Sequence, residues 1–396
     1  MKIDGFMKVL VLSVSVGLGH MRAAEAIKKA AGYLHAGAEV DILDTFRYAS
    51  PFLEKIILGT YMEILKMSPV IYGYIYKKAE FGQPLSGRGK DEFNKVLDRI
   101  TSPRLEEYIK IKRPEAIICT HPFPLGVICR IKRRGAYRGP VLAAITDYTV
   151  HSFWIFKETD FYLVADEELV SQCWNFGISP ERVYPTGIPI DPDFNGNYDK
   201  EKIRAELGLE PSLSTILIIG GGLGMGPLES AVKEISGSRS DCQLIVVTGT
   251  NAVLQEKLSR LVPGLACKAK VCGFVNDIHR LMAASDIMMG KSGGLTCAEA
   301  MAAGLPVLIV DPLPGQEERN AEFISAKGAG MRVTERALAA SIESLLAEPE
   351  KIRKMAEKAR SIGKPKAALD AVRIMAGAVG DKERPKTAGA EMRCVD

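Results

Sequence analysis

Apolar residues in this chain fall into short runs that alternate with amphipathic stretches. The first run, at residues 7–16, is rich in β-branched side chains and ends in a glycine-containing loop, after which residues 23–34 follow a helical pattern. Further strand-like runs lie at 39–43, 116–120 and 141–145, with helical segments between them. This alternation predicts a parallel, doubly wound α/β sheet.

The pattern starts again after a proline-rich stretch at residues 185–192. A β-branched run at 215–219 leads into a second glycine loop and a helix. The strand-like runs that follow lie at 243–248, 270–272, 286–289 and 306–310. The repetition predicts a second Rossmann-like α/β domain behind the first.

Length and composition agree with two hydrophobic cores. At 396 residues the chain exceeds what one core usually supports, and 47% apolar with 25% charged residues is ordinary globular composition. We therefore expect an N-terminal domain at 1–194, a C-terminal domain at 195–365, a final helix at 366–380 and a disordered polar tail at 381–396.

Basic residues are concentrated in the first half of the chain. Residues 51–140 hold 17 Lys and Arg against 9 Asp and Glu, and residues 51–81 mix tyrosines and aliphatic side chains with lysines. These features favour an interfacial helical segment, in which residues 51–90 bind an anionic membrane surface. The alternative is a helical excursion packed into the first core. Because no long uncharged apolar run or signal peptide is evident, we expect a cytoplasmic protein peripherally associated with the inner face of the cell membrane.

Two strand-to-helix glycine loops indicate phosphate binding, because glycine lets backbone N–H groups approach an anion at a positive helix terminus. Neither loop is a dinucleotide fingerprint, since Arg22 and Pro227 stand where the third glycine belongs. A nicotinamide enzyme is therefore disfavoured. Gly290-Lys291-Ser292 resembles the end of a P-loop, but Ser285 replaces the leading glycine, which argues against a nucleoside triphosphatase.

A paired-glycine turn at residues 290–300 opens a helix, with Glu299 one turn inside it. Such a helix start can receive a diphosphate, while Glu299 accepts hydrogen bonds from ribose hydroxyls. The alternative is that Thr296 and Glu299 only support the first turn of the helix. The polar loop at 311–320 follows a buried strand, which is where open α/β sheets bind ligands.

Seven motifs, in the family's order, give residues 7–345 a resemblance to the diacylglycerol glycosyltransferases. This family contains the monogalactosyldiacylglycerol synthases and the processive diacylglycerol glucosyltransferases, and is related more distantly to the lipid II-forming N-acetylglucosaminyltransferase. The motifs are SVSVGLGH at 13–20, THPFP at 120–124, DYTVHSFW at 147–154, TGIPI at 186–190, GGGLGMG at 220–226, KSGGLTCAEA at 291–300 and PGQEERN at 314–320. The resemblance implies the GT-B architecture, in which two Rossmann-like domains face each other across a cleft.

The resemblance also implies an acceptor site on the first domain. It places His20 in the cleft as the general base for the acceptor hydroxyl, which suits a neutral imidazole near pH 7. The alternative is a histidine that only caps its helix. Asp147 is expected to orient His20 or position the acceptor, and Gly19, His151 and Trp154 to lie on the acceptor side. Asp147 and His151 alternatively form a hydrogen-bonded pair that fixes their loop.

Contacts to a UDP-hexose donor are implied for the second domain. Backbone and polar groups near the two glycine loops are expected to hold the nucleotide, and the polar loop after the fifth strand of that domain the sugar. The expected contacts are, for the diphosphate, Gly221, Gly222, Gly293, Gly294, Leu295 and Thr296; for the ribose, Glu299; for the uracil ring, Phe274; and for the sugar hydroxyls, Gln316, Glu317 and Asn320.

No obligatory metal or other cofactor is expected. Asp191-Pro192-Asp193 spells the metal-binding signature of a different glycosyltransferase fold, but its place in the proline-rich stretch indicates a turn. The eight cysteines have no zinc-site spacing. Helix termini and backbone donors are instead expected to stabilise the leaving diphosphate.

The expected activity is an inverting transfer of a hexose from a UDP-sugar to diacylglycerol or a related lipid, with no nucleic acid partner. The hexose stays open between glucose and galactose, because these epimers differ at one hydroxyl. Two alternatives remain: a transferase for another lipid-linked or soluble acceptor, and a catalytically silent nucleotide-sugar-binding regulator.

Overall fold

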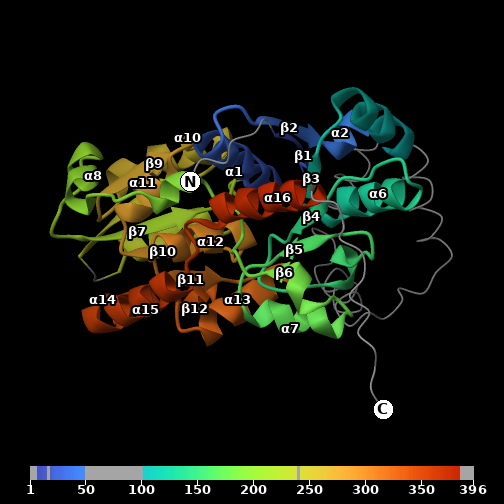
Figure 1. Ribbon diagram of the computed structural model, residues 1–396. Coiled ribbons are helices and arrows are strands. Elements are labelled where there is room, and N and C mark those ends of the chain that lie inside the picture. The colour runs from blue at the N-terminus through green and yellow to red at the C-terminus, as the bar shows by residue number, and fades with distance from the viewer. Residues whose placement is uncertain (1–6, 16–17, 50–100, 239–240, 384–396) are drawn as a thin grey trace, which may run out of the picture.

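The computed structural model describes residues 7–15, 18–49, 101–238 and 241–383, which fold around two parallel β-sheets (Figure 1). The predicted membrane-binding segment at 51–90 lies outside the described residues, as does the predicted tail beyond residue 383. Within the described part of the chain, no helix is both long and apolar enough to cross a bilayer.

The first sheet has six parallel strands in the order β2-β1-β3-β4-β5-β6. Its strands are β1 Lys8–Ser13, β2 Glu39–Asp44, β3 Ala116–Cys119, β4 Val141–Ala144, β5 Phe161–Leu163 and β6 Val183–Tyr184. Strand β2 lies on one side of β1, and β3, the next strand along the chain, lies on the other side. The carboxyl ends of β1 and β3 therefore flank a switch point, where doubly wound sheets bind ligands.

The first domain carries helices on both faces of its sheet. They are α1 Gly19–Leu34, α2 Thr45–Ala49, α6 Pro122–Arg133 and α7 Glu168–Asn175, with residues 101–112 also helical. Helix α1 packs closely because small residues form most of its buried face, including Ala23, Ala30 and Ala31 around Ile27. Helix α6 begins with Pro122 after His121, whose Nδ1 accepts a hydrogen bond from the amide of Phe123 at 3.1 Å.

The second sheet is also parallel, with the order β12-β11-β10-β7-β8-β9. Its strands are β7 Ser214–Ile219, β8 Cys242–Val247, β9 Ala269–Cys272, β10 Ile287–Gly290, β11 Val307–Val310 and β12 Gly330–Val333. This is the strand order of nucleotide-binding doubly wound domains, with the switch point between β7 and β10. The two sheets confirm the predicted fold class.

Eight helices precede, separate or follow the strands of the second domain. They are α8 Lys200–Glu206, α9 Leu228–Ser236, α10 Ala252–Leu261, α11 Ile278–Ala283, α12 Gly294–Ala302, α13 Gln316–Ala326, α14 Leu338–Leu346 and α15 Pro349–Ile362 within the described residues. Helix α12 follows β10 directly, so its N-terminus lies at the switch point.

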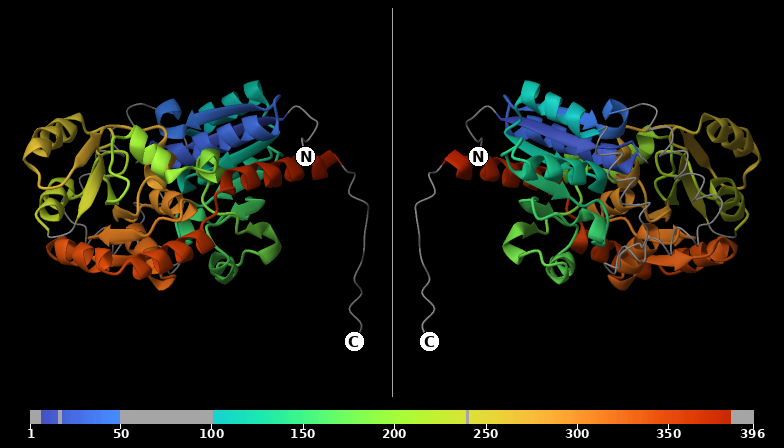
Figure 2. Two further views of the ribbon diagram at one scale, coloured as in Figure 1. Left: turned by 90° about the vertical axis from the view of Figure 1, so that its left-hand side faces the viewer. Right: turned by 90° about the vertical axis from the view of Figure 1, so that its right-hand side faces the viewer.

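The last helix, α16 Ala367–Glu383, returns to the first domain. Figures 1 and 2 show it, in red, running beside the first domain rather than the second. Ala371, Val372 and Met375 are buried in the same core cluster as Ala24 and Ile27 of α1. The sequence predicted this helix but gave no indication of the surface that it covers.

Three strands were not predicted from the sequence. They are β5, β6 and β12, with three, two and four residues. Strands this short carry little periodic signal, and each of them pairs with the edge of a neighbouring strand. The predicted domain limits at 194 and 365 stay predictions, while the sheets themselves span 8–184 and 214–333.

Candidate active site

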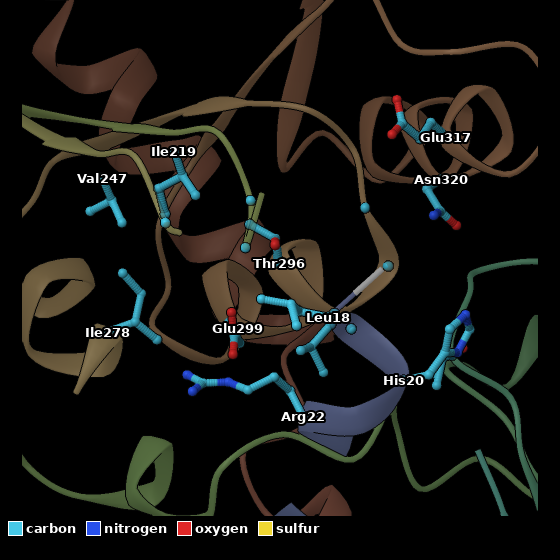
Figure 3. A pocket seen from close by; sticks show the side chains of 18 of the residues that line it. Leu18, His20, Arg22, Ile219, Val247, Ile278, Thr296, Glu299, Glu317 and Asn320 are labelled. Atoms are coloured by element: carbon cyan, nitrogen blue, oxygen red, sulfur yellow. The ribbon is translucent and has the colours of Figure 1, made fainter. Parts of the chain in front are cut away.

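A cavity of about 310 Å³ lies between the two domains, at the carboxyl ends of both sheets. Figure 3 shows its lining side chains, with Glu299 and Ile278 at one end and His20 and Asn320 at the other. Every residue predicted to bind substrate or act in catalysis lines this cavity, except His151 and Trp154. Segments that are far apart in the sequence are therefore brought to one site by the two switch points.

Two helix N-termini lie close together in the lining of the cavity. Helix α1 begins at Gly19 and helix α12 at Gly294. A methyl group placed on Gly19 would lie 3.7 Å from Cβ of Leu295 in the first turn of α12. The free N–H groups and the positive dipole ends of both helices therefore converge on one space, which favours an anion there.

Two of the cavity glycines are required for contact between the domains. A side chain on Gly222 would overlap Leu18 of the first domain, and one on Gly294 would overlap the carbonyl oxygen of Thr146. Gly221 is different, because its φ of +64° lies in the left-handed region and a Cβ added to it would meet no other atom. The glycine motifs thus serve close packing of the domains as well as access to an anion.

His20 is held in one tautomer by the main chain. Its Nδ1 lies 2.9 Å from the carbonyl oxygen of Thr120 and 3.0 Å from Oγ1 of Thr146. A carbonyl oxygen only accepts, so Nδ1 carries the hydrogen and Nε2 keeps its lone pair. Burial lowers the pKa of His20 below its ordinary value of 6.5, an effect that the charge of Asp147 and the Thr120 hydrogen bond partly oppose. The imidazole is therefore neutral near pH 7 and can accept a proton at Nε2.

Asn320 links the two domains beside His20. Its Nδ2 donates to Oδ1 of Asp147 at 3.1 Å and to the carbonyl of Ser292 at 2.9 Å, while its Oδ1 accepts from the amide of Tyr148 at 2.8 Å. The side chain is fully buried and both of its hydrogens are donated to protein acceptors, while the residue also lines the cavity. Its expected contact with the sugar hydroxyls stays a prediction.

Asp147 acts on His20 through its charge. Its hydrogen bonds come from Asn320 and, at 3.4 Å, from Nε2 of Gln316, whereas His20 is oriented by Thr120. Burial raises the pKa of Asp147, while the Asn320 hydrogen bond and the charge of His20 lower it. The expected role of Asp147 in orienting His20 is thus taken by a carbonyl at the carboxyl end of β3.

Glu317 is used by its own loop. Its Oε2 accepts from the amide of Leu313 at 2.9 Å, and its carbonyl accepts from Oγ of Ser292 at 2.6 Å. Burial raises its pKa, and the charge of Lys291 opposes the shift. Glu317 therefore joins the loop before α13 to the loop before α12, while Gln316 of the same turn lines the cavity.

Glu299 and Arg22 form the other end of the cavity. Burial raises the pKa of Glu299 to about 7, and the charge of Arg22 acts against this shift. The guanidinium carbon of Arg22 lies 5.5 Å from the ring centroid of Phe274, which is half exposed. Arg22 was not predicted as a site residue. Its place two residues after His20, in the first turn of α1, is the only sequence signal that pointed to it.

Other lining residues were also missed by the sequence analysis. They are apolar or small groups that end strands or begin helices next to the predicted glycines: Leu18, Thr146, Ile219, Val247, Gly249, Val275 and Ile278. Their proximity to the glycine loops at the carboxyl ends of the strands was the available signal.

His151 and Trp154 do not reach the cavity. They are 2% and 1% exposed, and their rings pack 6.4 Å apart around the short helical turn Ser152–Trp154. Burial lowers the pKa of His151 to about 4. Both residues are buried in the first domain outside this cavity, and their expected contact with the acceptor stays a prediction.

The acidic pair in the proline-rich segment is engaged within the chain. Nζ of Lys29 on α1 lies 2.8 Å from Asp191 and 2.7 Å from Asp193. The Asp191 carboxylate also accepts from the amide of Asp193 at 2.9 Å, as in a turn. The pair therefore ties the interdomain connection to α1.

Comparison with known families divides the chain at the same place as its sheets. Residues 20–190 match the family described as monogalactosyldiacylglycerol (MGDG) synthase, and residues 215–372 match the glycosyltransferase family 28 C-terminal domain. Similar proteins named processive diacylglycerol beta-glucosyltransferase occur in Bacillus pumilus, 29% identical with 90% of this chain and 91% of the relative covered, and in Bacillus subtilis, 29% identical with 88% and 89% covered.

Solved structures share the fold at low sequence identity. MurG of Acinetobacter baumannii has a TM-score of 0.61 at 17% identity, covering 94% of this chain and 99% of its own. The Anabaena protein Alr3699/HepE, solved with UDP-glucose, has a TM-score of 0.54 at 15% identity, covering 95% and 99%. These likenesses agree with a GT-B arrangement of the two domains.

Proposed function

We propose, on the premise that this chain belongs to the glycosyltransferases that combine a monogalactosyldiacylglycerol synthase region with a family 28 C-terminal domain, that it transfers a hexose from a UDP-sugar to diacylglycerol. The product is a β-glycosyl-diacylglycerol. The observation that carries the proposal is the interdomain cavity, which combines two converging helix N-termini, a neutral histidine at one end and a buried carboxylate at the other.

The donor is assigned from the chemistry of the second domain's end of the cavity. The N-termini of α1 and α12 suit a diphosphate, Glu299 suits ribose hydroxyls, and Phe274 with Ile278 suits the uracil ring. The Anabaena protein Alr3699/HepE, which has the same fold, was solved in complex with UDP-glucose. A UDP-hexose fits all three features.

The reaction follows from the tautomer of His20. Nε2 takes the proton of the acceptor hydroxyl while that oxygen attacks the anomeric carbon on the face opposite UDP. The bond between the anomeric carbon and the diphosphate oxygen breaks, and the electron pair leaves with UDP. Backbone N–H groups at the helix N-termini stabilise the charge on the leaving diphosphate, and we propose that no metal is obligatory.

The acceptor is assigned from the relatives, whose names specify diacylglycerol. We propose that residues 51–90 bring the chain to the inner face of the cell membrane, where lysines meet anionic headgroups. Replacing Lys66, Lys77 and Lys78 together with Glu should remove most binding to anionic vesicles in flotation, and salt should weaken the binding of the parent protein. Equal flotation of the parent and the triple variant would assign membrane binding to another segment.

A matrix of UDP-glucose and UDP-galactose against vesicles of diacylglycerol and glycosyl-diacylglycerol tests the function. The expected result is a β-linked glycolipid from one donor, formed also in the presence of EDTA. Calorimetric binding of UDP without transfer to any acceptor would support the silent regulator instead. A strict requirement for added manganese would contradict the metal-free step.

A further inference from the structure

Arg22 stands in an unexpected place for a residue of the first domain. It lies in the first turn of α1, two residues after His20, yet its side chain extends to the opposite end of the cavity (Figure 3). There it lies near Glu299 and over the ring of Phe274, which are both second-domain residues. The donor end of the cavity is therefore built from both domains.

Arg22 and Glu299 also line a second, smaller cavity beside the main one. This cavity of about 260 Å³ is lined by Arg22, Glu299 and Leu295, which also line the main cavity, and by Lys29 and Asn276. Arg22 and Glu299 thus belong to the wall between the two cavities. A guanidinium in this wall closes the main cavity at the end where the ribose is proposed to bind.

The charges around Glu299 leave Arg22 as its main cationic partner. Asp191 raises the pKa of Glu299 and Arg22 lowers it. Lys29 is held 2.8 Å and 2.7 Å from Asp191 and Asp193, so its charge is directed to them. Glu25, also on α1, lines the smaller cavity beside Arg22. Among the described groups, Arg22 is thus the cation that favours an ionised Glu299.

We propose that Arg22 is a positioning residue for the nucleoside half of the donor, supplied across the cleft by the first domain. The inference rests on the proposed UDP-sugar donor. The guanidinium lines the donor end of the cavity together with Glu299, which is proposed to accept the ribose hydroxyls, and its charge favours the ionised carboxylate. It also lies over the ring of Phe274, which bounds the proposed uracil site. Lysine offers the charge but not the planar guanidinium.

Titration calorimetry on the full chain tests this role with three probes: UDP, uridine and inorganic pyrophosphate, each between pH 6 and 8.5. Arg22→Gln is expected to weaken the binding of UDP and of uridine by a similar factor of about ten, as for a lost charged partner. The affinity for pyrophosphate should stay unchanged. The same variant should also move the loss of UDP affinity on acidification to higher pH. Arg22→Lys should keep the parent pH profile and lose less affinity for UDP and uridine than Arg22→Gln does. Lys28→Gln, an exposed cation of the same helix, should match the parent.

Three results would overturn the inference. Unchanged affinity and pH profile in Arg22→Gln would show that Arg22 does not act on the donor. Weaker pyrophosphate binding with unchanged uridine binding would assign Arg22 to the diphosphate. A parent protein that binds no UDP would overturn the proposed donor together with the inference. If Arg22→Gln does not fold, Arg22→Lys decides, because a purely electrostatic role predicts parental affinity for uridine.

Discussion

The tautomer of His20 is set by a main-chain acceptor, and its neutral state is set by burial. The carbonyl of Thr120 fixes the hydrogen on Nδ1, and burial disfavours the charged ring. His121, the next residue, packs edge-on against the same ring at 4.7 Å, and burial holds its pKa well below 6.5 as well. Two uncharged imidazoles are therefore in contact, and His20, which lines the cavity, is the one placed to accept a proton from the proposed acceptor.

Replacing His20 with Ala should lower kcat by about a hundredfold or more, because the proton acceptor is lost, while UDP affinity stays near that of the parent. In the parent, the pKa of His20 lies below 6.5, so the proton-accepting form persists down to that pH. Activity should then be lost only as the pH falls through the lowered value. Profiles of kcat/KM against pH provide the measurement. An acid limb at or above pH 6.5 would assign the base to another group.

The ionised form of Glu299 lowers the stability of the folded protein. Its folded-state pKa of about 7 lies above the ordinary value of 4.5, so the folded protein holds this proton more tightly than the unfolded chain. Ionised Glu299 thus destabilises the fold progressively from pH 4.5 to pH 7, and fully above pH 7.

Glu299→Gln should remove that cost but weaken UDP binding. The variant should match the parent in stability near pH 4.5 and exceed it at pH 8 by on the order of 3 kcal/mol. Urea denaturation at both pH values measures the difference, and calorimetry measures UDP affinity. A variant that is less stable than the parent at pH 8 would show that the carboxylate is stabilised by its surroundings.

Motifs identified most residues of the cavity but not their partners. His20, Glu299 and Gln316 were expected there and line it. Asn320 was expected to hold sugar, and two of its three hydrogen-bond partners come from a loop more than 170 residues away, a pairing that no local pattern encodes. His151 and Trp154 were assigned to the acceptor side from the family resemblance, and a loop sequence does not show which of its side chains turn inward.

The start of helix α12 serves both anion binding and domain contact. Gly294 faces the carbonyl of Thr146, and the two domains can approach this closely because glycine has no side chain. Gly293, one residue earlier, has an ordinary φ of −60° and open space around it. The two adjacent glycines therefore offer a matched pair of substitutions.

Gly294→Ala should lower the melting temperature by several degrees and enlarge the molecule, because the new methyl group overlaps the Thr146 carbonyl and separates the domains. Gly293→Ala should melt within about a degree or two of the parent, since no atom lies within 4 Å of its added carbon. Thermal denaturation and small-angle scattering report the two effects. Equal behaviour of both variants would mean that the domains adapt without strain.

The strands that the sequence predicted correctly include the long ones with runs of apolar residues. Ser214–Ile219 and Cys242–Val247 each contain four consecutive aliphatic residues, a pattern that is visible in the sequence. The two-residue strand β6, Val183–Tyr184, forms by pairing with the edge of β5. The parallel arrangement followed from the alternation with helices, whereas edge strands depend on tertiary contacts.

The chain passes between its domains twice, since α16 returns to the first domain after α15. Apolar side chains of α16 share a core cluster with α1, the helix that carries His20 and Arg22. The sequence predicted this helix as a separate element after the second domain and did not indicate its packing partner, because contacts between residues far apart in sequence leave no periodic pattern.

A chain that ends at Lys366 should therefore lose stability in its first domain, because the apolar face of α1 becomes exposed. A matched chain that ends at Glu383 keeps all of α16 and should melt as the parent does. Differential scanning calorimetry distinguishes the two truncations. Parental melting of the shorter chain would mean that α16 contributes little to the first domain.

The hydrogen-bonded pair of Asp147 and Asn320 has a consequence for hybrid enzymes. A second domain taken from a relative brings its own side chain to position 320, and any residue without an amide donor leaves the buried Asp147 carboxylate short of a partner. Exchanging donor preference between relatives by swapping this domain should succeed only when both positions are transferred together. The two domains therefore depend on each other through this hydrogen-bonded pair. Positions 147 and 320 are expected to differ together among relatives with different sugar preferences.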